Sequence, residues 1–169
     1  MAADLVSTFE TALDGLAVTH ERTTAAELPA AVRRAVVAPA VGAPLPWDDL
    51  TLDGSGVNLS PTAGELRDAA TGVTAAGAAV ASEGSLLVQS RPGGDELVSV
   101  YPPRHVAVVR AGDVVADVPA AIGWLGDEFA AGRRSAVFAT GPSATADMGE
   151  LVEGVHGPGA VHVVTVAEP

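Results

Sequence analysis

Four short segments of the sequence bring reactive side chains next to glycine or proline, and one of them, 140–147 (TGPSATAD), carries three hydroxyl groups. The hydroxyls of Ser143 and Thr145, with Gly141 and the free backbone N–H groups at the start of the helix predicted to follow, would suit a carboxylate or a phosphate. The same residues also fit a structural role, in which Ser143 caps that helix and Asp147 interacts favourably with its dipole. The residues alone leave both interpretations open.

A histidine between turn residues defines a second segment, 154–158 (GVHGP). Glycine on both sides would leave the backbone around His156 exposed, and an imidazole in that place could give or take a proton near neutral pH. His156 could equally be an incidental side chain in a turn before the last strand.

The other two segments carry a carboxylate and a cation. Residues 72–74 (GVT), which include Thr74, precede 79–86 (AVASEGSL), where Glu83 stands directly before a predicted strand. Glu83 could act as a base or remain a solvated residue at the strand end. In 101–105 (YPPRH), Arg104 is a candidate for binding an anionic ligand, with a surface ion pair as the alternative.

The composition excludes several kinds of chemistry. The chain has 169 residues, 21 acidic and nine basic, all nine of them arginine, with a formal charge of -12. Without cysteine it forms no disulfide, ligates no iron–sulfur cluster and builds no Cys-based zinc site, and without lysine it has no Walker loop. The histidines (20, 105, 156 and 162) lack metal-ligand spacing. We therefore expect no metal and no cofactor in this chain. The negative charge argues against nucleic acid and anionic membranes as partners.

The acidity has two interpretations, a surface for a partner or adaptation to salt. The carboxylates are scattered, and the absence of lysine beside abundant alanine and valine favours a halophilic protein with a well-solvated surface. The longest apolar run, residues 35–47, contains three prolines and is too short to span a membrane. Since the N-terminus has no signal-peptide pattern, we expect a cytoplasmic protein.

Alternating helices and buried strands must position the reactive groups. Apolar periodicity and capping residues predict helices over 2–14, 25–34, 61–70, 117–131 and 144–153. Strands are expected over 16–20, 35–38, 56–59, 84–90, 96–101, 106–109, 135–139 and 161–166, with a turn at 92–95 (PGGD) joining 84–90 and 96–101 as a hairpin. This order indicates an α/β fold, in one domain over 1–169, with a mixed, mostly parallel sheet flanked by helices on both faces. In such sheets ligands bind at the carboxyl ends of the strands.

Taken together and in order, the segments resemble a known family. The blocks 72–74 (GVT), 79–86 (AVASEGSL), 102–109 (PPRHVAVV), 141–147 (GPSATAD) and 154–158 (GVHGP) are similar to those of the LUD domain, of the LutC/YkgG type. The resemblance covers roughly residues 70–167, and the first 60 residues match poorly. Two positions depart from the family pattern. Ala144 stands where the family often has arginine, and the acidic residue of the family's Ala-Asp/Glu-Thr-Gly-Thr motif is shifted or replaced at 81–85.

The resemblance implies a fold like that of the NagB/RpiA/CoA-transferase group and a role in oxidising L-lactate to pyruvate. It also implies iron–sulfur partner proteins similar to LutA and LutB, with the clusters only in those partners. On this view the chain is an accessory, ligand-binding subunit whose small carboxylate or phosphorylated ligand is lined by Ser143, Thr145, Asp147 and His156, with Thr74, Glu83 and Arg104 approaching it. The alternatives are a free-standing isomerase-like or CoA-transferase-like enzyme, with Glu83 or His156 as general base, and a non-catalytic assembly or regulatory module.

Overall fold

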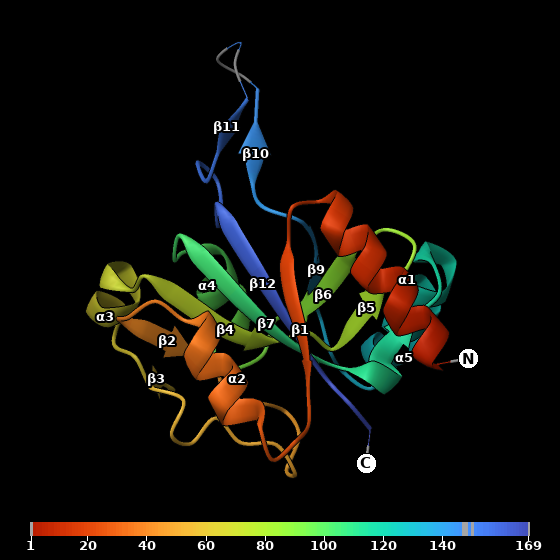
Figure 1. The fold of residues 1–169 in the computed structure, drawn as a ribbon, viewed down its shortest axis with the longest axis horizontal. Coiled ribbons are helices and arrows are strands. Elements are labelled where there is room, and N and C mark those ends of the chain that lie inside the picture. Colours follow the sequence, from red (N-terminus) through yellow and green to blue (C-terminus); the bar gives the residue numbers. More distant parts are fainter. Residues whose placement is uncertain (1, 147–148, 150, 169) are drawn as a thin grey trace.

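A six-stranded parallel sheet forms the centre of the protein, in a computed structural model that describes residues 2–146, 149 and 151–168 (Figure 1). Across the sheet the strands are β1 (Thr19–Thr23), β12 (Ala160–Val166), β7 (Arg104–Arg110), β4 (Thr71–Ala75), β2 (Ala40–Gly42) and β3 (Val57–Asn58). The valine-rich, buried sequences of β7 and β12 suit their central places, because both faces of this sheet are covered.

A second, four-stranded sheet packs beside the first. Its order is β8 (Val114–Val115), β5 (Ala78–Val80), β6 (Ser85–Gln89) and β9 (Ala136–Thr140). The β5–β8 pair is parallel, whereas β5–β6 and β6–β9 are antiparallel. A pair of short antiparallel strands, β10 (Ala144–Thr145) and β11 (Val152–Glu153), projects from the body as an arm (Figure 1).

Helices cover the sheets and begin at residues suited to capping. They are α1 (Ala2–Gly15), α2 (Leu28–Ala35), α3 (Ala63–Asp68), α4 (Asp95–Val100) and α5 (Val118–Ala130), with a 3-10 turn, η1, at Ala111–Asp113. The Thr62 side chain accepts a bond from the Glu65 N–H, and the Glu65 carboxylate accepts one from the Thr62 N–H, so α3 starts with a capping box. The Asp117 side chain accepts from the N–H of Ala120 at the start of α5. No helix of the described residues is long and apolar enough to cross a membrane.

The two faces of the parallel sheet have separate cores. On one face α1 packs against β7, β12 and the second sheet, through Val6, Phe9, Leu13, Leu86, Ala107, Val109, Val161 and Val163. On the other face α2 packs through Leu28, Ala31, Val32, Val73, Val106, Val108, Val164 and Val166. Alternate residues of β7 thus point to opposite cores, as a strand requires. The α/β fold class and the flanking helices agree with the prediction from the sequence.

Residues 95–100 form the helix α4, so the predicted strand at 96–101 and the hairpin 84–101 are wrong. Val98 and Ser99 are buried while Leu97 and Val100 are exposed, which is a helical and not a strand-like pattern. Gly94, at φ +79°, begins the helix in the left-handed region. The strand at 84–90 exists as β6, but its antiparallel partners are β5 and β9 in the second sheet.

The predicted helix at 144–153 is also wrong, because its described residues form β10, β11 and their connections. Two strands are displaced from their predicted positions as well. The strand expected at 35–38 lies at 40–42, and the one expected at 16–20 lies at 19–23. The helix expected at 25–34 begins at Leu28. Predictions for 2–14, 61–70, 117–131, 135–139 and 161–166 are confirmed to within a few residues at their ends.

Helix α4 lies in direct contact with β4 at Gly72. A Cβ built on Gly72 would stand 1.9 Å from the carbonyl oxygen of Val98 and 3.1 Å from the ring of Pro102. The backbone of α4 therefore occupies the space that any side chain at this position would need. This contact fixes the distance of α4 from the sheet, and α4 in turn supplies one wall of the site described next.

Candidate functional site

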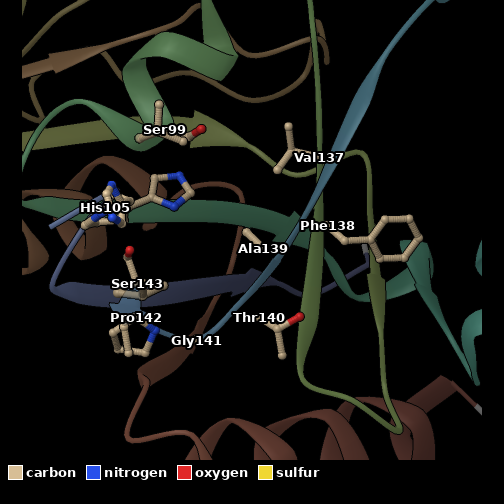
Figure 2. Close-up of a pocket in the computed structure, with 15 residues that line it drawn as sticks. Ser99, His105, Val137, Phe138, Ala139, Thr140, Gly141, Pro142 and Ser143 are labelled. Carbon is tan, nitrogen blue, oxygen red and sulfur yellow. The ribbon is translucent and has the colours of Figure 1, made fainter. Parts of the chain in front are cut away.

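A cleft of about 540 Å³ lies between the end of β9, the last turn of α4 and the amino ends of β7 and β12 (Figure 2). Its polar lining comprises Ser99, His105, Thr140, Ser143 and His156. Figure 2 shows the side chains of His105 and Ser143 on one side of β9 and the Phe138 ring on the other. None of the described residues that line the cleft is an arginine, an aspartate or a glutamate.

Two hydrogen bonds bring the Gly-Pro-Ser and Gly-Val-His-Gly-Pro blocks together at this cleft. The N–H of Ser143 donates to the carbonyl of Pro158 at 2.8 Å, and the N–H of Gly154 donates to the carbonyl of Ser143 at 2.8 Å. Gly141, at φ +70°, takes a left-handed conformation where the chain leaves β9 for the arm. The outgoing and returning chains are thus joined at the base of the arm, which places Ser143 and His156 on one cleft wall.

His105 is the most deeply buried polar residue of the lining. Its side chain is 2% exposed, and its Nε2 lies 2.9 Å from the Oγ1 of Thr74. Burial lowers the pKa of His105 to about 4, so the ring is neutral at physiological pH. A neutral imidazole has one donor and one acceptor nitrogen, and Thr74 engages Nε2. His105 can therefore offer Nδ1 as a hydrogen-bonding group without bringing a charge.

The hydroxyl groups at the other walls are held by local hydrogen bonds. Ser99 donates to the carbonyl of Glu96 at 2.8 Å, within α4. The Thr140 hydroxyl is 2.7 Å from that of Ser85, across the β6–β9 pair. Such fixed hydroxyls, with a neutral imidazole, can orient a small polar ligand.

The structure brings together three of the residues proposed from the sequence, Gly141, Ser143 and His156. Thr74 lies behind the cleft, fully buried, and reaches it through His105. Arg104 precedes His105 on β7, and its Nε donates to the carbonyl of Ala35 at 2.9 Å, away from the lining. Thr145 lies in β10, and Glu83 is exposed in the turn between β5 and β6; neither lines the cleft. Asp147 lies outside the described residues.

The location of the cleft differs from the expected one. In the parallel sheet it lies at the amino ends of β7 and β12, next to His105 and Val161, and not at the carboxyl ends. It does lie at the carboxyl end of β9, but that strand belongs to the second, mixed sheet. Because residues 144–145 form the strand β10, Ser143 is not the cap of a helix. The anion-binding helix start expected there is therefore absent from the described residues.

Two residues of the lining, His105 and Ser99, are not among the site residues predicted from the sequence. The sequence does contain a signal for His105, because the residue lies on the same face of β7 as the buried residues Ala107 and Val109. A histidine in such a run needs a hydrogen-bonding partner, and here that partner is Thr74. Among the residues that the structure describes, no group of three or more His, Asp or Glu side chains is placed to hold a metal ion.

Replacing Thr74 with valine should lower the free energy of unfolding by about 1–3 kcal/mol, because Nε2 of the buried His105 would lose its partner without a change of shape. Chemical denaturation of the two forms measures the difference. The matched control is the same substitution in a His105→Leu background, where there is no ring nitrogen left to satisfy. An equal loss in both backgrounds would show that the hydrogen bond contributes nothing.

Fold and cleft together define an α/β protein whose candidate ligand site is assembled from two glycine- and proline-rich blocks. The LUD domain model matches residues 62–166, and the chain belongs to the LUD domain family. Lactate utilization protein C of Deinococcus radiodurans is 30% identical over 173 residues, which cover 97% of this chain and 80% of that protein. A crystal structure of a DUF162 family protein from Deinococcus radiodurans is 26% identical, with a TM-score of 0.76 over 98% of each chain. The resemblance drawn from the residue blocks is thereby confirmed.

Proposed function

We propose that this protein has a role in lactate utilization, as an accessory, ligand-binding subunit of a system that oxidises L-lactate to pyruvate. The observation that carries the proposal is the likeness to lactate utilization protein C along 97% of the chain. Because the chain has no cysteine, any cysteine-ligated iron–sulfur cluster of such a system belongs to other proteins, which would resemble LutA and LutB.

The cleft is the proposed ligand site, and a small hydroxy- or keto-carboxylate is the proposed ligand. Ser143 and His156 supply polar groups at the base of the arm, and His105 adds a neutral imidazole. No carboxylate among the described lining residues would repel an anion. A free-standing enzyme with Glu83 as its base has less support, because Glu83 is exposed outside the cleft.

L-Lactate or pyruvate should raise the melting temperature of the wild-type protein, and Ser143→Ala and His156→Ala should each weaken that effect strongly. A ligand at a hundred times its Kd stabilises a protein by about 2.7 kcal/mol, which thermal denaturation resolves as a shift of several degrees. The scan is made in high salt, where a formal charge of -12 is screened, and includes acetate, nucleotides, CoA and sugar phosphates.

Ser82→Ala is the matched control, because Ser82 is exposed in the turn before Glu83 and does not line the cleft. It should leave every ligand response unchanged. A shift that persists in both site variants would place the ligand elsewhere. No shift with any compound would instead favour a non-catalytic assembly module. Co-purification with a protein that shows iron–sulfur absorbance tests the partner separately.

A further inference from the structure

Strand β9 is an edge strand whose outer backbone groups face away from its neighbour. Within the described part of the chain β9 pairs with β6 alone. The N–H of Ser90 donates to the carbonyl of Ser135, in the same antiparallel register that pairs Val88 with Val137. Hydrogen-bonded pairs alternate along such a ladder, so Val137 and Ala139 bond to β6. The backbone groups of Ala136, Phe138 and Thr140 consequently point outward.

The side-chain contacts support this assignment of the ladder. Ser85 and Thr140 stand opposite each other, with their hydroxyls 2.7 Å apart, as expected for a close, non-hydrogen-bonded pair. The carbonyl of Leu87, opposite Phe138, accepts from Gly77 on the other side of β6 and therefore does not bond to β9. Backbone donors and acceptors thus recur at every second residue of the outer edge, about 6.8 Å apart.

This outer edge forms one wall of the cleft. Four consecutive residues of β9, Val137 to Thr140, line the cleft. A strand that presented only one face would contribute alternate residues, so a continuous run indicates that the edge itself is presented. No backbone or side-chain partner of the outward groups occurs among the described residues. The opposite wall is made by α4 and by the amino ends of β7 and β12.

The edge also lacks the protection that exposed strands usually carry. Residues 136–140 (AVFAT) contain no charge and no proline, and no bulge interrupts their pairing with β6. Arg134 stands just before β9, whereas its neighbour Arg133 is already paired with a carboxylate, its Nε lying 3.5 Å from Oε2 of Glu128. On a chain with a formal charge of -12, Arg134 is the cation at this end of β9 that would attract an acidic segment.

We propose that the cleft receives an extended segment of a partner protein, which pairs with the outer edge of β9 as an added strand and carries a carboxylate at the end near Arg134. Pairing with the backbone supplies affinity and the cleft walls select side chains. One extended segment fits a cleft with a wall opposite β9, whereas the edge of another copy would bring its own β6 with it. The inference rests on the proposed function only for the existence of a partner. The partner segment would bind the edge of β9, whereas the proposed small ligand would bind Ser143.

Short random peptides displayed on phage are the probe, and Phe138→Pro is the decisive variant. Proline at this outward position removes one edge N–H but leaves the ladder to β6 intact. Peptides selected on the wild-type protein should bind Phe138→Pro roughly tenfold more weakly or worse. The matched control is Phe138→Ala, which removes the ring and keeps the N–H, and it should retain binding. Acidic residues should be enriched at one end of the selected peptides.

Amide hydrogen exchange gives a second measurement that does not depend on the variant. In the free protein the amides of Ala136, Phe138 and Thr140 should exchange faster than those of Val137 and Ala139, and a selected peptide should protect them. Selected peptides that bind Phe138→Pro equally well, or that protect other regions, would overturn the proposal. So would a failure to select any peptide. A wild-type dimer that Phe138→Pro dissociates, seen by sedimentation, would show that a second copy occupies the edge. None of these outcomes would contradict the proposed binding of lactate, which is tested separately.

Discussion

Replacing Gly72 with alanine is expected to lower the free energy of unfolding by about 3 kcal/mol or more, through overpacking of a site that has no room for a methyl group. The added Cβ would stand 1.9 Å from the carbonyl oxygen of Val98. That atom belongs to the backbone of α4, so relief requires the helix to move and not a side chain to turn. A displaced α4 would also move Ser99 and the cleft wall that it forms.

Gly123→Ala is the control for this prediction. Gly123 lies within α5 and has no atom within 4 Å of the position that its Cβ would take. The same chemical change should there stabilise the protein by about 0.5–1 kcal/mol, because alanine favours a helix over glycine. Urea denaturation of both variants measures the two effects. A Gly72→Ala protein as stable as the wild type would mean that α4 is not held against β4 at the observed distance.

The free energy of unfolding should fall by about 3 kcal/mol between pH 6.5 and pH 4 because of His105 alone. Burial lowers the pKa of this ring from 6.5 to about 4 in the folded protein, whereas the unfolded chain keeps the ordinary value. Between these two values the unfolded state binds more protons than the folded state. The free energy of unfolding therefore rises with pH across this window. The contribution of His105 is fully present above pH 6.5, and no more of it is lost below pH 4.

Denaturation curves recorded across this window for wild type and His105→Leu isolate the contribution. The variant should lose less stability on acidification, although it is less stable than the wild type at neutral pH because Thr74 loses its partner. His156→Ala serves as the control, since His156 is exposed, and it should keep the wild-type pH dependence. Parallel curves for wild type and His105→Leu would contradict a buried, neutral His105.

Elements with strong local signals could be predicted from the sequence, and elements defined by distant contacts could not. Helix α5 follows from Asp117 and Pro119, which begin it, and β12 follows from a valine-rich run. Strands β4 and β5, at 71–75 and 78–80, consist mostly of small residues, so their sequences show little alternation of polar and apolar side chains. Their burial comes from the helices and strands that cover them.

The errors at α4 and the arm have the same physical origin. The three apolar residues in 95–100 are compatible with a strand as well as with a helix. The helix packs against the sheet where Val98 approaches Gly72, a residue remote in sequence. In 144–153 the chain is held as a pair of strands by bonds between Ser143, Gly154 and Pro158. The residue pattern within a short segment contains no information on such distant partners.

Some residues of the candidate site could be predicted from the sequence, but their arrangement around one cleft could not. Gly141, Ser143 and His156 could be identified because unusual residue types stand together in each block. The role of His105 depends on its place on β7 and on Thr74, which pairs with it across two neighbouring strands. The location at the amino ends of the parallel strands depends on the path of β9, and no residue type signals that path.

The strand order also governs when the protein can fold during its synthesis. β1 is made before the other strands, but its partner in the sheet is β12, with Thr19 opposite His162. β12 then joins β1 to β7, so the sheet has a gap until residues 160–166 have left the ribosome. The apolar face of α1 must wait equally long for Val161 and Val163. A nascent chain of this topology keeps β1 unpaired until β12 has been made, and it depends on slow, long-range pairing afterwards.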